Sequence, residues 1–257
     1  MKKIDKIIDG RKILLTLIML MAALPLSAQS TNPNGLNLPG LSVNFGQGVD
    51  LVDTIKVLVL FTLLTVAPAI IILTTCFTRI VVVLGFMRQA LGTQNLPPNQ
   101  LLIGLAVFLS IFVMQPTGEA IYQKAILPYL DKKITTTEAI DEITLDMRAF
   151  MSKQVRKTDI GLFYDVTGKA APNTIEEVPI HFLIPAFIIS ELKTAFQIGF
   201  LLYIPFLILD MVVASVLMAM GMMMLPPVVI SLPFKLLLFV LVDGWQLVTG
   251  SILRSFN

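Results

Sequence analysis

The stretch that decides the fold reads PAFIISELKTAFQIGFLLYIPFLILDMVVASVLMAMGMMMLPPVVISLPFKLLLFVLVDGW and extends from Pro185 to Trp245. Most of it is apolar enough for lipid or for a dry protein interior. A charged side chain costs roughly 2.5–3.5 kcal/mol at the bilayer centre. Charged residues are therefore not expected in a segment that only anchors a protein in the membrane. We therefore interpret the stretch as lining or framing a path, with its methionine cluster at the narrowest point. It carries the charged residues Glu191, Lys193, Asp210, Lys235 and Asp243 and the methionines Met222, Met223 and Met224.

The composition is that of a membrane protein or of a subunit of a membrane assembly. Of the 257 residues, 56% are hydrophobic and 14% are charged. Soluble domains average about 45–50% apolar and about 25% charged residues. The net charge of +2 gives no basic footprint for nucleic acid. Cys76 is the single cysteine, so the chain forms no internal disulfide.

The first 48 residues predict a signal peptide and a flexible lead-in. Residues 1–28 combine a lysine-rich start, an apolar core at 13–24 and a small-residue cleavage site ending at Ala28. The alternative is an uncleaved anchor helix, but the apolar core is shorter than the ~20 residues that a span needs. Residues 29–48 are rich in Asn, Gly, Pro and Ser, which favours loose or extended structure.

The rest of the chain predicts an all-α fold of two long hydrophobic helical hairpins, 49–118 and 180–257, with a small helical domain between them. That domain, 119–179, holds half of the chain's Asp, Glu, Lys and Arg residues. Such a charge density excludes it from lipid. A cleaved signal peptide followed by an apolar hairpin would leave it outside the cytoplasm, which makes it a periplasmic domain in a bacterium.

One helix of this domain is predicted in detail. Thr135 and Glu138 fit a capping box, and apolar residues then recur at helical spacing to about Arg156. The helix either packs within its own small domain or also offers its apolar face to a neighbouring copy, since a domain of ~60 residues buries little surface alone. The apolar positions are Ile140, Ile143, Met147, Phe150, Met151 and Val155.

Proline and polar residues predict where the hydrophobic helices end. We expect Pro116 to end the apolar helix that starts at Leu101. The polar tetrad 190–193 is expected to interrupt the third apolar block, and Pro226-Pro227 to end it. The segment from Lys235 to Val248 reads as one final apolar helix.

The charged residues within the two hydrophobic hairpins are expected to have neutralising partners. Asp210 and Lys235 lie on opposite sides of the Pro226-Pro227 turn, so a hairpin would let them face and neutralise each other. The alternative is that either side chain reaches water or headgroups. Glu191 and Lys193 are too close in sequence to pair on one helix, so we expect them to pair with other segments or copies.

The methionine cluster can be interpreted in two ways, as a seal of a channel or as ordinary packing between helices. On a helix, three adjacent methionines would point about 100° apart, and a ring of copies would bring one or two from each to a shared axis. Methionine is flexible and polarizable, and hydrophobic constrictions gate by dewetting. The alternative is ordinary gap-filling in a helix interface.

The sequence carries no recognisable catalytic or cofactor motif. It has no G-x-x-x-x-G-K-[ST] phosphate loop, and its single histidine, His181, has no cluster of metal-ligand spacing around it. We therefore expect a non-enzymatic protein without a cofactor, in which His181 is an interface or core residue.

Several long motifs, in collinear order from residue 77 to residue 245, resemble the FliP family of flagellar type III secretion export-gate proteins, which is related to the injectisome SctR proteins. The segments that carry the resemblance are Phe77-Thr78-Arg79-Ile80, Leu91-Gly92-Thr93, Pro97-Pro98-Asn99-Gln100, Pro185 to Phe200, Asp210 to Pro227 and Leu232 to Trp245.

The resemblance implies an integral membrane export-gate subunit. Such proteins form a homo-pentamer that is completed by FliR and surrounded by FliQ, and they work with the other flagellar export proteins. Unfolded rod, hook and filament subunits pass through this channel at the bacterial inner membrane, in the flagellar basal body. The family's gasket corresponds to Met222, Met223 and Met224. The helices rise towards the periplasm, which would put Arg79, Glu191, Lys193, Asp210 and Lys235 in protein interfaces.

Two other functions stay open on the residues alone. A small-solute transporter or permease subunit would also explain broken helices and intramembrane charges, although no internal repeat is visible. A structural scaffold of the export apparatus would need the same helices without lining the path.

Overall fold

The computed structural model describes residues 35–38, 41–44, 51–93, 96–168, 170, 172, 174–222 and 224–256. The predicted signal peptide and Met223 lie outside the described residues. The chain divides into two compact units, Met1–Val66 and Ala67–Asn257. Apart from one short hairpin in the first unit, the described elements are helical, which agrees with the predicted fold class.

The first unit contains a two-stranded hairpin that the sequence did not predict. Strand β1 (Gly35–Leu38) pairs antiparallel with β2 (Leu41–Asn44). Strands of four residues are too short to show a clear alternation of apolar and polar side chains, so the segment reads only as a lead-in. Helix α2 (Leu51–Leu73) begins in this unit and crosses its boundary.

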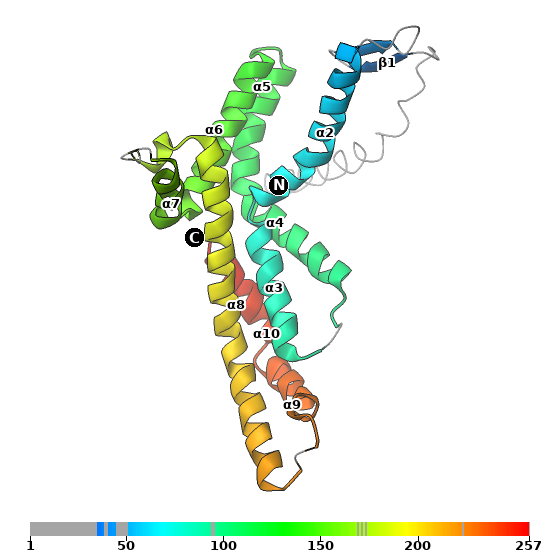
Figure 1. The fold of residues 1–257 in the computed structure, drawn as a ribbon, viewed down its shortest axis with the longest axis vertical. Helices are drawn as coiled ribbons and strands as arrows, with labels where there is room; N and C mark the ends of the chain where they lie inside the picture. Colours follow the sequence, from blue (N-terminus) through cyan, green and yellow to red (C-terminus); the bar gives the residue numbers. More distant parts are fainter. Residues whose placement is uncertain are drawn as a thin grey trace, which may run out of the picture. The chain divides into compact units, whose positions relative to one another are not determined.

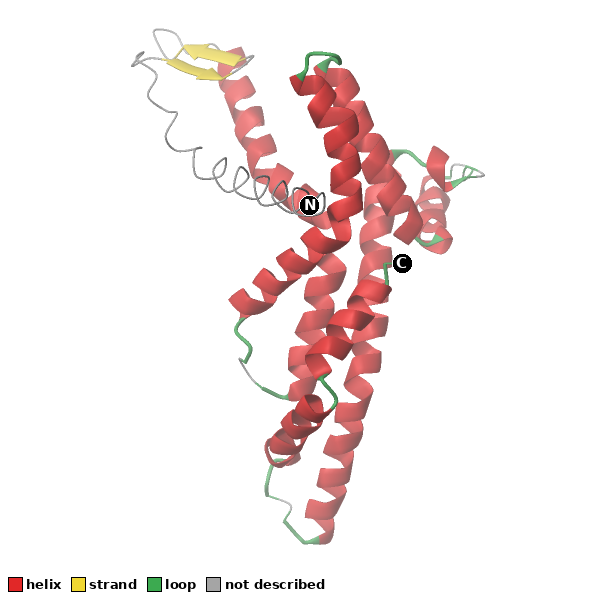
Figure 2. Cartoon of the chain, turned by 180° about the vertical axis from the view of Figure 1, so that it is seen from behind, coloured by secondary structure: helices red, strands yellow, loops and turns green. Residues whose placement is uncertain are grey.

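The second unit is built around one long helix, α8 (Ile180–Ala219). Figures 1 and 2 show α8 running beside α3, and helices α6, α7, α9 and α10 also contact it. The other elements of this unit are α3 (Phe77–Leu91), α4 (Asn99–Ile121), the π-helical turn η1 (Tyr122–Ile126), α5 (Leu127–Leu130), α6 (Thr136–Gln154), α7 (Lys157–Thr167), the 3-10 turn η2 (Ile175–Glu177), α9 (Pro227–Leu241) and α10 (Gly244–Arg254).

Two clusters of buried apolar side chains hold the second unit together. The larger one joins α3 to α4, α8, α9 and α10, with Ile80, Val83 and Leu84 fully buried. The smaller one fixes α6 and α7 on α8 through residues such as Met151 and Phe187. Both clusters meet α8, so this helix carries the packing of the hydrophobic helices and of the charged domain alike.

Helix α6 begins with the predicted capping box. The Glu138 backbone N–H donates to the Thr135 hydroxyl, and the Thr135 backbone N–H donates to the Glu138 carboxylate at 2.7 Å. These hydrogen bonds hold the pKa of Glu138 below its usual value. The cap therefore supports the helix above the ordinary pKa of glutamate and weakens as the pH falls below it. The predicted apolar face is buried at Met151 and Val155, whereas Ile140 is exposed.

Three predicted helix boundaries are wrong. Pro116 lies inside α4, and the chain stays helical through η1 to Leu130, although a proline inside a helix removes one backbone donor. The tetrad 190–193 does not interrupt α8, because Ser190 and Glu191 are buried and hydrogen-bonded. The final apolar helix is two helices, α9 and α10, bent by 66° at a break where Asp243 takes φ +50°.

The close approach of α3 and α8 depends on Gly199. A Cβ at this position would lie 2.6 Å from the ring of Phe86, so a larger residue must push the two helices apart. We expect Gly199→Val to lower the free energy of unfolding by about 1–3 kcal/mol. Thermal unfolding of the detergent-solubilised chain measures this, with Gly85→Ala as the matched control, because a Cβ at Gly85 meets nothing within 4 Å. Equal unfolding midpoints for both variants would contradict the assigned contact.

Candidate functional site

Arg79 and Glu191 form a buried ion pair between α3 and α8. Their exposed fractions are 1% and 0%. The Arg79 Nε donates to Glu191 Oε2 at 2.9 Å, and Nη2 donates to Glu191 Oε1. This two-bond geometry matches the planar guanidinium to the carboxylate. The sequence predicted that Glu191 would pair with another segment, and its partner lies 112 residues away in the chain.

The remaining donors of Arg79 bind the end of α6 and the C-terminal tail. Nη1 donates to the Ser255 carbonyl at 2.7 Å and to the Ser255 hydroxyl at 3.0 Å, and Nη2 donates to Gln154 Oε1 at 3.0 Å. The ring of Phe256 lies 3.9 Å from Arg79 Cζ. All five N–H donors of the guanidinium are thus used, which offsets the cost of burying the charge.

Asp210 and Lys235 form a second ion pair, between α8 and α9. Lys235 Nζ lies 2.6 Å from Asp210 Oδ2 and 3.2 Å from the Ala90 carbonyl at the end of α3. The hydroxyl of Ser231 donates to Asp210 Oδ1. The Lys235 side chain is 2% exposed and the Asp210 side chain 23%. As predicted from the hairpin, the two charges face each other, and the cation also lies where the α3 dipole favours it.

Each of the two ion pairs ties other helices to α8, and the second also joins the two helices that flank the methionine cluster. The first ties α3, α6 and the tail to α8, and the second ties α9 and the end of α3 to α8. Separating the fully buried pair of Arg79 and Glu191 would leave an uncompensated charge, which disfavours any arrangement that moves α3 away from α8. The segment between Asp210 and Lys235, which carries the cluster, is therefore held at its base.

Met222 and Met224 lie in the connection between α8 and α9, and not on a helix as the interpretation of the cluster assumed. Helix α8 ends where Gly221 takes φ +76°, and the Met222 N–H donates to the Leu217 carbonyl at 3.0 Å. This cap turns the chain out of the helix and requires a left-handed residue, which explains the glycine. Met222 is 38% exposed and Met224 is 98% exposed, so neither fills the core of this chain.

Lys193 lies apart from both ion pairs. It is exposed on α8, whereas Glu191, two positions away, is fully buried, because residues two positions apart face different sides of a helix. His181 is also exposed. Among the described residues, no three His, Cys, Asp or Glu side chains gather as a metal site.

Several partners in these networks were missed from the sequence. These partners belong to common residue types and form no sequence motif. Only the packing of the helices brings them next to the charged side chains. Asp159 and Ser190 form a further buried contact, in which the serine hydroxyl donates to the carboxylate at 2.6 Å and docks α7 on α8. The missed partners of the two ion pairs are Ala90, Gln154, Ser231, Ser255 and Phe256.

Among the described residues, three helical stretches are long and apolar enough to cross a membrane: Ile55–Leu73, Asn99–Leu130 and Ile180–Ala219. The bent pair α9 and α10 adds a fourth if it counts as one span. Both ion pairs have a member on α8, the longest of these stretches. The candidate site thus belongs to a helical membrane protein.

Comparison with known proteins places the chain in a family. The model of the FliP family matches residues 60–252. The flagellar biosynthetic protein FliP of Bacillus subtilis is 57% identical over 204 residues, which is 79% of this chain and 92% of that protein. The proteins of the same name from Caulobacter vibrioides and Borreliella burgdorferi are 52% and 48% identical, over 84% and 90% of this chain and 82% and 91% of their own lengths. The chain belongs to the FliP family.

Proposed function

We propose that this chain is a channel-forming core subunit of the flagellar type III protein export gate. Its role is to pass unfolded rod, hook and filament subunits across the bacterial inner membrane during flagellum assembly, without enzymatic activity of its own. The observation that carries the proposal is the methionine turn at the end of α8, in which Met222 and Met224 are exposed. The ion pair of Asp210 and Lys235 holds this turn at its base. Membership of the FliP family supports it.

The length of α8 supports a position displaced towards the periplasm. Its 40 residues extend over about 60 Å at 1.5 Å per residue. The hydrocarbon core of a bilayer is about 30 Å thick. A straight helix of twice that length, with Glu191 and Asp210 along it, fits a stack of helices that rises out of the membrane better than a simple span.

Exposed apolar side chains support an oligomer. A single copy leaves large hydrophobic residues of α8 and α9 uncovered, which marks surfaces for lipid or for other proteins. We propose that sister copies in a homo-pentamer, together with FliR and FliQ, cover them. The side chains concerned are Phe196, Phe200, Leu201, Leu207, Ile208, Met211, Val212, Phe234, Leu237, Val240 and Leu241.

The methionine turn suits a deformable seal. In a ring of copies, the turns that follow α8 would meet around the shared axis. Exposed, unbranched side chains re-pack around an object of irregular shape, and an apolar ring excludes water and ions when the object is absent. The ion pairs keep α8 and α9 in place while the turn moves.

Crosslinking of a substrate tests this function. Cys76 is fully buried, and burial raises the pKa of its thiol to about 11, so it stays protonated and unreactive near neutral pH. In Met224→Cys the introduced thiol is therefore the reactive one. We expect a stalled export substrate with a thiol-reactive probe to crosslink to it in cells that assemble flagella.

The control is Lys133→Cys, which puts an exposed thiol in the charged domain between α5 and α6. Crosslinks at residue 224 and none at residue 133 fit a subunit that lines the path. Equal crosslinking at both positions, or none at residue 224, would instead favour a scaffold or a small-solute permease.

A further inference from the structure

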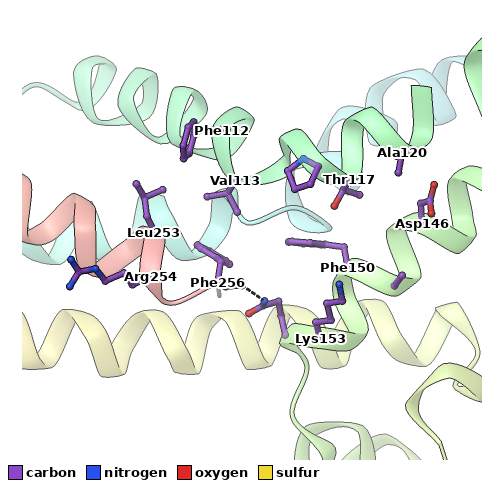
Figure 3. Close-up of a pocket in the computed structure, with 13 residues that line it drawn as sticks. Phe112, Val113, Thr117, Ala120, Asp146, Phe150, Lys153, Leu253, Arg254 and Phe256 are labelled. Atoms are coloured by element: carbon purple, nitrogen blue, oxygen red, sulfur yellow. Dashed lines mark hydrogen bonds between the residues drawn. The ribbon is translucent and has the colours of Figure 1, made fainter. Parts of the chain in front are cut away.

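A pocket outside the methionine site lies between α4, α6 and α10 (Figure 3). Its volume is about 520 Å³, within the range of about 300–1,000 Å³ that is usual for small-molecule sites. Aromatic and aliphatic side chains form most of its wall, among them Phe112 and Pro116 of α4, Phe150 of α6 and Leu253 of α10. These residues give the pocket an apolar wall.

One carboxylate oxygen in the wall of this pocket has no hydrogen-bond partner among the residues that the structure describes. Asp146 is 8% exposed, and its Oδ1 lies 2.6 Å from Lys124 Nζ. Its Oδ2 is buried, and no described residue donates to it. Buried polar atoms are nearly always satisfied, so this oxygen calls for a donor from outside the chain. A charged N–H donor would be the strongest partner for a carboxylate.

A cation lies two turns further along the same helix. Lys153 also lines the pocket, and its side chain is exposed. Residues seven apart share one helix face, and side chains lean towards the helix N-terminus, so the ammonium of Lys153 points back towards Asp146. Figure 3 shows the end of the Lys153 side chain beside Phe150. Arg254 of α10 also lines the pocket, but Figure 3 shows its guanidinium pointing away from Lys153 and Asp146.

The pocket lies where apolar and charged parts of the chain meet. Helix α4 belongs to a stretch apolar enough to cross a membrane, Asn99–Leu130, whereas α6 belongs to the charged domain. Basic pockets between membrane helices are known to bind the phosphate groups of lipid headgroups. The pocket therefore presents an apolar wall, a cation and an unused carboxylate oxygen in one place.

We propose that this pocket binds a phospholipid with a primary ammonium in its headgroup, of the phosphatidylethanolamine class. The phosphate lies against Lys153, the ammonium donates a hydrogen bond to Asp146 Oδ2, and an acyl chain covers the wall at Phe112 and Phe150. The three groups of the ligand match the three features of the pocket in sign and in chemistry. This site is independent of the proposed export function.

Native mass spectrometry of the purified full-length chain tests the proposal. The detergent-solubilised protein is offered equal amounts of phosphatidylethanolamine and phosphatidylcholine with identical acyl chains. Both lipids carry the phosphate, but the quaternary ammonium of phosphatidylcholine has no N–H to donate. We expect about tenfold more bound phosphatidylethanolamine, the ratio that one charge-assisted hydrogen bond supports.

Two variants assign the preference to the pocket. Asp146→Asn should reduce the preference, because the acceptor loses its charge, while phosphatidylcholine still binds. Lys153→Gln should weaken both lipids, and since this side chain is exposed, the fold does not depend on it. Lys133→Gln, an exposed lysine outside the pocket, is the control and should change nothing.

Equal binding of both lipids to the unmodified chain would overturn the proposal. So would an unchanged amount of bound phosphatidylethanolamine in Lys153→Gln, which serves as the test even if Asp146→Asn fails to fold. Failure of both lipids to bind the unmodified chain would also overturn the proposal, and a side chain of a partner protein would then be the better candidate for the pocket.

Discussion

Arg79→Ala should destabilise the chain more than Gly199→Val does. The substitution leaves the fully buried carboxylate of Glu191 without its partner, and it frees Gln154 and the Ser255 carbonyl. Removal of one member of a buried pair costs about 3–5 kcal/mol. Domains are stable by about 5–15 kcal/mol, so the loss is a large share of the total. Thermal unfolding of the detergent-solubilised chain measures it.

An exposed ion pair provides the matched control for this prediction. Lys133 lies 3.0 Å from Asp131, with side chains 71% and 47% exposed. Exposed pairs contribute about 0–1 kcal/mol, so Lys133→Ala should leave the unfolding midpoint nearly unchanged. The double variant Arg79→Met with Glu191→Met should lose less than the two single variants together, because it buries no lone charge. Strict additivity of the single effects would contradict the pairing.

Replacing Met222, Met223 and Met224 together by alanine should make the resting gate leak ions while the assembly stays intact. Shortening the side chains opens an apolar constriction to water, and a barrier lower by 1.36 kcal/mol already gives about a tenfold rise in rate. We therefore expect ion conductance to rise by about tenfold or more. Recordings of the purified assembly in planar bilayers measure it.

Assembly should survive this change because the cluster contributes little to the core. Met222 and Met224 are exposed, and exposed substitutions usually alter stability by no more than about 0.5 kcal/mol. Met218→Ala is the control, since this methionine is 58% exposed on α8 but lies before the turn. An unchanged conductance in the triple variant, or the same leak in Met218→Ala, would contradict the proposal that the three methionines seal the channel.

Local signals predicted parts of the fold well. The capping box at Thr135 and Glu138 and the helical repeat that follows it are set by neighbouring residues, so α6 could be read directly from the sequence. The pairing of Asp210 with Lys235 was also predictable, because a hairpin with Pro226-Pro227 at its turn brings these positions together.

Features that depend on distant partners could not be predicted. Ser190 and Glu191 resembled a break in an apolar block, but buried partners on α7 and α3 let the helix continue through them. Pro116 resembled a helix end, yet the chain remains helical beyond it. The methionines were assigned to a helix because Gly221 alone does not reveal that α8 ends there.

A density map of the intact assembly in its resting state tests the central claim most directly. The claim is that the turns after α8 converge at the narrowest point of a shared channel. The account predicts that the side chains of Met222 to Met224 from successive copies meet on the axis and close it. Methionines that face outward into lipid, or a path that runs elsewhere, would contradict it.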